Sequence, residues 1–124
     1  MSLKHLLLLV LVILVSTACS ELDTTLLYGK WKGHQMLESG KVVDKGAELV
    51  RFEFDANGTY KYELAHMKEA GHFRTLEDKL YTKDTIDDKR LEKVVRVVLL
   101  TTDSLHLQMN SAGKNQLLKC YKQK

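Results

Sequence analysis

The chain of 124 residues contains no proline and only two cysteines, Cys19 and Cys120. Without proline, turns depend on glycine, asparagine and aspartate, which interrupt the chain often and leave short segments between them. Stretches of about 12 or more residues with a 3.6-residue apolar period, the pattern of long helices, are missing. Alternation of apolar and polar residues with a period of two is common instead, which favours β-strands.

Other absences narrow the classes of function. The 19 basic and 16 acidic side chains are interspersed, with no basic stripe or arginine-rich arm, which disfavours nucleic acid as a partner. The sequence has no glycine-rich phosphate loop and no Cys/His cluster with the spacing of metal ligands. Asp103, Ser104 and His106 do not converge as a triad, because adjacent strand residues point to opposite faces. We therefore expect no enzyme, no catalytic residue, no metal and no cofactor.

The only long apolar run lies at the N-terminus. Residues 6–15 are all apolar, follow the basic Lys4, and precede the small residues Ser16, Thr17 and Ala18. A transmembrane helix needs about 20 apolar residues, so this run is too short to span a bilayer. A buried leucine-rich helix is a second possibility, but the run has no polar face. The layout predicts a secretory signal peptide over residues 1–18.

The segment VSTAC, which ends at Cys19, resembles the lipobox of bacterial lipoproteins, with Ser16 where leucine is usual. The resemblance implies cleavage before Cys19, a diacylglycerol on its sulfur and a further acyl chain, such as palmitate, on its amino group. Several acyl chains anchor a protein stably to a lipid bilayer. Ser20 resembles an outer-membrane sorting signal, so the expected location is the cell envelope of a Gram-negative bacterium, on the periplasmic face or the surface. Secretion with an incidental cysteine is the alternative.

The clearest structural signal is a β-hairpin over residues 50–64. Apolar and polar residues alternate on both sides of Asn57-Gly58, a pair that favours a tight turn. Segment 64–70 can be a bent strand end or a short helical turn, and Lys83–Arg90 is a candidate longer loop. The other six expected strands lie at 30–37, on both sides of Glu77-Asp78 within 71–85, and at 94–100, 105–109 and 116–122.

Eight short strands joined by short turns predict an all-β domain with antiparallel neighbours. An open sheet would expose two edges, and closing the sheet removes them. We therefore expect an eight-stranded up-and-down barrel over residues 26–124, after a tether at 19–25. The interior of such a barrel is either filled or holds one small ligand. A two-sheet sandwich would need longer crossovers. Cys120 is expected to pack inward without a disulfide partner.

The motifs YGKWKG, RFEFDANGTYKY and LTTDSLHLQMN together resemble the small lipocalin-like domain of Bacteroidetes lipoproteins, over about residues 26–121. This resemblance implies an eight-stranded barrel in which Gly29 opens the first strand and Trp31 packs across the closed end. It also implies a basic side chain lying over the Trp31 ring as a cation–π contact. Lys119 is expected in that role, with Lys122 as the other candidate.

The residues point to two classes of function. Phe52, Tyr60 and Tyr62 are expected to face inward and could line a ligand cavity. Arg96, within an apolar run, either faces outward or is buried and could bind a ligand carboxylate. The predicted function is a membrane-anchored barrel that binds a small hydrophobic or amphiphilic ligand. The alternative is a filled barrel that acts as a protein-interaction or inhibitor module, with its protein partner unknown.

Overall fold

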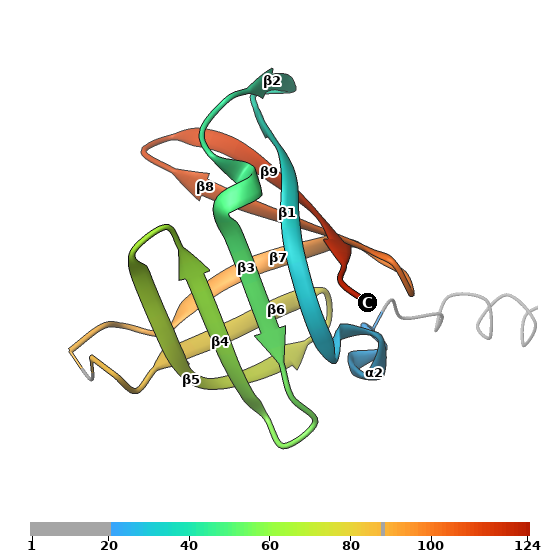
Figure 1. Cartoon of the computed structure of the whole chain (residues 1–124), viewed down its shortest axis with the longest axis vertical. Helices are drawn as coiled ribbons and strands as arrows, with labels where there is room; N and C mark the ends of the chain where they lie inside the picture. The colour runs from blue at the N-terminus through green and yellow to red at the C-terminus, as the bar shows by residue number, and fades with distance from the viewer. Residues whose placement is uncertain (1–20, 88) are drawn as a thin grey trace, which may run out of the picture.

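This computed structural model describes residues 21–87 and 89–124, so the signal segment and Cys19 lie outside the described residues. The described chain forms nine strands and two short helices (Figure 1). The elements are α2 (Thr24–Leu27), β1 (Gly29–Glu38), β2 (Lys41–Val43), η1 (Ala47–Leu49), β3 (Val50–Phe54), β4 (Thr59–Leu64), β5 (Met67–Leu76), β6 (Lys79–Asp84), β7 (Lys93–Leu100), β8 (Ser104–Ser111) and β9 (Lys114–Lys122).

Eight of the nine strands, β1 and β3 to β9, form a closed antiparallel barrel. Each strand pairs with its neighbour along the chain, and β1 pairs with β9, where Leu37 lies opposite Leu117. The all-β, eight-stranded barrel predicted from the sequence is confirmed. The additional strand β2 pairs with β1 alone. Strand β1 extends beyond its pairing with β3, and the chain then turns back at Ser39 and Gly40, both with positive φ. Figure 1 shows β2 projecting beyond the barrel.

The segment 64–70 is a tight strand-to-strand turn and not a helical one. Ala65 adopts a φ of 53°, and Leu64 pairs with Met67 across the turn. Strand β5 therefore begins at Met67, four residues before Gly71, where the expected segment 71–85 starts. The longer loop expected at Lys83–Arg90 corresponds to residues 85–92, between β6 and β7.

Helix α2 covers the end of the barrel at which β1 begins (Figure 1). The Asp23 side chain caps this helix by accepting a hydrogen bond from the backbone N–H of Thr25 at 3.1 Å. Leu27 and Trp31 are fully buried, and the Trp31 indole N–H donates to the Leu27 carbonyl at 2.8 Å. Leu22 also packs against the core, so the docked part of the chain begins before residue 26.

The basic residue over Trp31 is Lys122, whereas the sequence analysis named Lys119 first. The Lys122 Nζ lies 5.0 Å from the Trp31 ring centroid and donates to the carbonyls of Leu26, at 3.4 Å, and Tyr28. Trp31 and Lys122 are direct partners across the β1–β9 pairing, so their side chains share the inner face. Strand alternation directs Lys119 to the outer face.

Gly29 lies where Lys122 crosses the start of β1. A Cβ atom at Gly29 would lie 2.6 Å from the Lys122 Cε, and Gly29 has a φ of +125°, a conformation that side chains rarely adopt. On the outer face, Lys119 pairs with His106 across β8 and β9. Burial and the neighbouring Lys119 charge lower the pKa of His106. The residue types at the closed end are therefore those expected, but the lysine differs.

The core fills the closed half of the barrel. Phe54 is fully buried and meets Phe73 edge to face at 5.1 Å. Cys120 is a buried free cysteine, as predicted, and burial raises the pKa of its thiol to about 12.

Within residues 21–87 and 89–124, no helix combines the length and apolar character needed to cross a membrane.

The closed end yields a test of the Lys122 contacts. Lys122→Met keeps an apolar stem over Trp31 but removes the charge and its hydrogen bonds to two carbonyls, so we expect the free energy of unfolding to fall by about 1–3 kcal/mol. The matched control Lys119→Met, on the outer face of the same strand, should change it by less than about 0.5 kcal/mol. Urea unfolding monitored by fluorescence measures both variants. Equal losses would show that Lys122 has no special role.

Candidate functional site

The open half of the barrel holds a cavity of about 300 Å³. It lies where β1, β4 and β8 end and where β5, β7 and β9 begin, opposite the end that α2 covers. Most of its wall is apolar, with a small number of polar groups. Its lining residues are Met36, Lys45, Ala47, Val50, Phe52, Tyr60, Tyr62, Leu64, Met67, Glu69, Leu80, Thr82, Lys93, Val95, Leu107, Met109, Gln116 and Leu118.

Three of the four residues predicted to line a ligand cavity do so. Phe52, Tyr60 and Tyr62 come from the β3–β4 hairpin, where alternation directs them to the same inner face. The Phe52 and Tyr62 rings lie 4.9 Å apart. Tyr60 lies deeper, with only 2% of its surface exposed.

Arg96, the fourth predicted residue, lies outside the cavity. Its side chain is 61% exposed, and its Nε donates to the Asp78 carboxylate at 2.7 Å. The residues on either side of Arg96 in β7 face inward: Val95 lines the cavity and Val97 is buried. Because apolar residues occupy both faces of this strand, alternation left the orientation of Arg96 open, and the pairing with β6 decides it. Arg96 therefore has the outward of the two expected orientations, and the prediction that it could bind a ligand carboxylate inside the barrel is wrong.

Methionine is concentrated at the cavity. Met36, Met67 and Met109, the three methionines in the part of the chain that the structure describes, come from β1, β5 and β8 and all line it. Methionine is flexible and polarisable, so its side chain adapts to apolar ligands of different shapes. The sequence analysis did not identify this group, because the three strands lie far apart in the chain.

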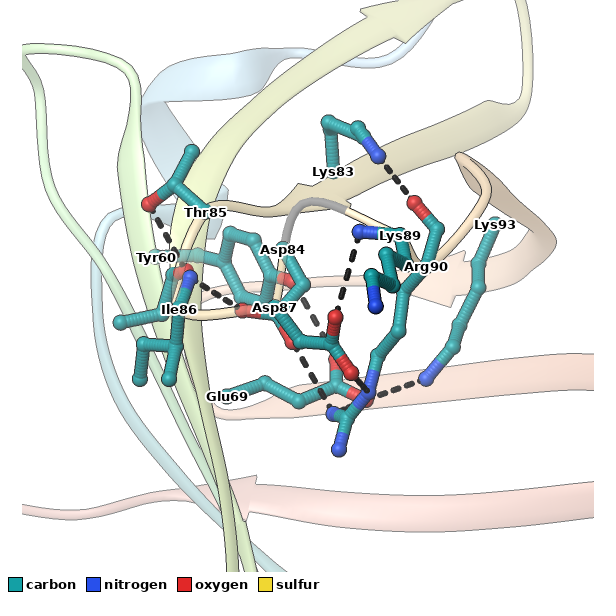
Figure 2. Close-up of polar contacts among 11 residues, drawn as sticks. Tyr60, Glu69, Lys83, Asp84, Thr85, Ile86, Asp87, Lys89, Arg90 and Lys93 are labelled. Atoms are coloured by element: carbon teal, nitrogen blue, oxygen red, sulfur yellow. Dashed lines mark hydrogen bonds and ion pairs between the residues drawn. The ribbon is translucent and has the colours of Figure 1, made fainter.

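A buried carboxylate supplies the main polar feature of the cavity. Glu69 is only 4% exposed, and its Oε2 accepts a hydrogen bond from the Tyr60 hydroxyl at 3.2 Å. Its other oxygen, Oε1, accepts from the Arg90 guanidinium at 3.2 Å and from the Lys93 ammonium (Figure 2). A buried carboxylate is costly unless it is paired. Glu69 therefore has charge-assisted partners on one oxygen and a phenol on the other.

Arg90 joins this carboxylate to a second buried one. Its Nη1 lies 2.9 Å from the Asp84 Oδ2, and Figure 2 shows the guanidinium between Glu69 and Asp84. Burial opposes ionisation of Asp84, but backbone hydrogen bonds from Ile86 and Ala70 and the Arg90 charge together hold the pKa of this carboxyl below its usual 3.8. The loop over residues 85–92 is thus fastened to the barrel beside the cavity.

The phenols of the cavity stay protonated over a wide range of pH. Burial, together with the Glu69 charge, raises the pKa of Tyr60 to about 12. Burial and Glu69 also raise the pKa of Tyr62. At neutral pH both hydroxyl groups can therefore donate hydrogen bonds, and that of Tyr60 already donates to Glu69.

Helix η1 covers one side of the cavity, and Gly33 permits its close approach. A Cβ atom at Gly33 would lie 2.3 Å from the Ala47 carbonyl oxygen, and the β1–β9 pairing is irregular between Gly33 and Gln35. This packing brings Ala47 and Lys45 to the cavity wall. The Lys45 Nζ donates to the Glu38 carboxylate at 2.5 Å.

The cavity wall combines apolar side chains with a few polar groups, which is the composition typical of small-ligand sites. In the described ranges, no group of three or more His, Cys, Asp or Glu residues could hold a metal ion.

The sequence analysis missed three polar residues at the cavity, Glu69, Arg90 and Lys93. A usable signal existed for Glu69: once the turn at residues 65–66 is recognised, Glu69 pairs directly with the inward Tyr62. No comparable signal existed for Arg90, which reaches the cluster from a loop.

The contribution to stability of the cluster formed by Glu69, Asp84 and Arg90 can be tested by comparing two arginine variants. Arg90→Met leaves buried Asp84 without this cation, whereas Arg96→Met removes an exposed ion pair, which contributes little to stability. We expect Arg90→Met to lower the free energy of unfolding at pH 7 by at least about twice as much as Arg96→Met. Urea unfolding of the two variants measures the difference. Equal losses would contradict a stabilising role for the cluster.

The loss of stability caused by Arg90→Met should depend on pH. The lowered pKa of Asp84 contributes stability above pH 3.8, and this contribution is lost as the pH falls through the folded-state pKa. Because Arg90 supplies part of that lowering, the stability difference between the parent and Arg90→Met should shrink below pH 3.8. A difference that grows in acid would contradict this assignment.

Comparison with known proteins supports the fold. In sequence, the chain matches no family model and no curated protein. In structure, it is similar to an uncharacterized protein from Bacteroides eggerthii, with a TM-score of 0.56 and 15% identity over 76% of this chain and 98% of that one. It is also similar to a lipocalin-like protein from Bacteroides uniformis, with a TM-score of 0.55 and 17% identity over 76% of this chain and 97% of that one. The chain therefore has a lipocalin-like fold, an eight-stranded antiparallel barrel closed at its Trp31 end.

Proposed function

We propose that this barrel binds a small hydrophobic or amphiphilic ligand in its open half. The supporting observation is the cavity of about 300 Å³, whose wall combines apolar side chains with the Tyr60, Glu69 and Lys93 group. Ligand sites are typically apolar cavities with a few polar groups that orient the ligand. This volume lies at the lower end of the range for such sites, so the ligand is small.

The distribution of polar groups suggests how the ligand lies. Leu80, Leu107 and Leu118 line the cavity and are nearly fully buried, so an apolar part of the ligand would contact them. The polar groups of Lys93 and Glu69 would meet the other part of the ligand beside the loop at residues 85–92. The Tyr62 hydroxyl is an available donor for a ligand oxygen. This arrangement favours an amphiphile over a purely apolar molecule.

The hollow interior also separates the two functions left open by the sequence. A filled barrel that acts only through its outer surface would need no internal cavity, so the cavity favours ligand binding.

We further propose that acylated Cys19 anchors the domain in the outer membrane, on the basis of the apolar run at 6–15 and the lipobox-like segment. Catalysis and nucleic-acid binding are not part of the proposal.

Ligand binding can be tested with an uncharged apolar dye, N-phenyl-1-naphthylamine. The parent protein should bind it saturably, and Val95→Trp, which fills the cavity, should weaken binding at least about tenfold. The matched control Val94→Trp adds the same group to the outer face of the same strand, where Val94 is 53% exposed, and should bind as the parent does. Circular dichroism confirms folding of each variant. Failure of the parent to bind, or equal loss in both variants, would contradict the proposal.

The anchor can be tested by mass. Protein purified from its own membranes should have the mass of residues 19–124 plus a diacylglycerol and one further acyl chain. Cys19→Ala should abolish acylation, whereas Cys120→Ala, which changes the buried cysteine, should retain it. Intact-mass spectrometry gives the result directly. A mature chain without acyl mass would contradict the anchor and leave the ligand-binding proposal standing.

A further inference from the structure

We infer that the closed end of the barrel faces the bilayer and that the cavity mouth opens away from it, into the aqueous compartment. This inference rests on the proposed anchor at Cys19 and adds an orientation to it. The supporting observations are that Leu22 and Thr24 are bound to the closed end of the barrel and that Cys19 is only three residues before Leu22.

The first described residues are attached to the closed end. The Leu22 N–H donates to the Glu77 carbonyl in the β5–β6 turn at 3.2 Å, and the Leu22 side chain packs against the core. The Thr24 and Thr75 hydroxyl groups lie 2.9 Å apart, and α2 follows immediately. Three contacts thus hold the chain at the end that carries Trp31, opposite the cavity mouth.

The length of the intervening chain limits where an anchor can lie. Cys19 is three residues before Leu22, and three fully extended residues span at most about 11 Å. Strand β5, with 10 residues, extends about 30 Å from the closed end to the mouth. An acyl group on Cys19 can therefore reach a bilayer beside the closed end, but it cannot reach one placed across the mouth.

Attraction between the side of the barrel and lipid headgroups would favour a different pose, with the barrel lying flat. The arginines on the β5–β7 side are neutralised by neighbouring carboxylates: Arg74 pairs with Glu92, and Arg96 pairs with Asp78. These pairs leave little free arginine charge, but exposed Lys68 and Lys79 lie on the same side and would attract an anionic surface. On a bilayer of zwitterionic lipid, which carries no net charge, the covalent attachment at Cys19 decides the orientation.

The orientation determines the route of the ligand. A mouth that points away from the bilayer exchanges ligand with the aqueous phase, and a ligand dissolved in the supporting membrane would first have to leave it. The expected ligand is therefore an amphiphile with measurable aqueous solubility, delivered from solution or by another carrier.

Energy transfer to the membrane tests the orientation. The mature chain, residues 19–124, is joined through the Cys19 thiol to a maleimide lipid in phosphatidylcholine vesicles, while Cys120 stays unreactive because it is buried. A dye is placed through azidophenylalanine at residue 102, just before β8, or at residue 111, the last residue of β8; both positions are exposed and lie roughly 25 Å apart. Transfer to an acceptor on the lipid headgroups should be at least about twofold higher from position 102 than from position 111.

A chain with 20 Gly/Ser residues inserted between Ser20 and Glu21 is the control. This linker spans about 25 Å on average, so the difference between the two dye positions should largely disappear. Equal transfer without the linker would indicate a barrel lying on its side, and higher transfer from position 111 would indicate the opposite orientation. Either result overturns the inference. Because the lipid is attached chemically, the outcome does not depend on natural acylation or on dye binding in the cavity.

Discussion

The pairing of β1 with β9 is the interaction on which the rest of this structure depends. It joins strands from opposite ends of the domain, as in the hydrogen bond between Gln116 and Glu38, which are 78 residues apart. Closure removes the exposed edges of the barrel sheet and gives each of its eight strands an interior face. The same pairing places Lys122 opposite Trp31 and so completes the plug at one end.

The two halves of that interior serve different purposes. At the closed end, Trp31 and Phe54 are large, rigid and fully buried, so they fill the space. Toward the mouth, the lining includes flexible methionines and a side of the wall formed by η1, and a cavity remains. One half of the barrel thus supplies a packed core, and the other half leaves a cavity.

Among the residues that the structure describes, the two buried charged side chains, Glu69 and Asp84, both lie at or beside the cavity. Glu69 and Asp84 share Arg90, which belongs to the loop at residues 85–92. Replacing such a cluster with apolar residues often leaves stability unchanged or improves it, so its presence is better explained by what it does at the cavity. It directs polar groups toward the cavity and holds the loop beside it. The N-terminal docking at the other end of the barrel keeps this opening remote from the attachment that we propose at Cys19.

The sequence by itself determined the fold class and the inward positions of Phe52, Tyr60 and Tyr62, because alternation and tight turns are local properties of the chain. The closed-end position of Trp31 was implied by the resemblance of its motif to lipocalin-like domains. Only the tertiary structure decided which face of β7 is internal, since that strand is apolar on both faces and pairing sets its orientation. Tertiary structure likewise brought Arg90 to Glu69, 21 residues away. Strand period gives the two faces of a strand, but the register between strands and the path of a loop depend on contacts between distant residues.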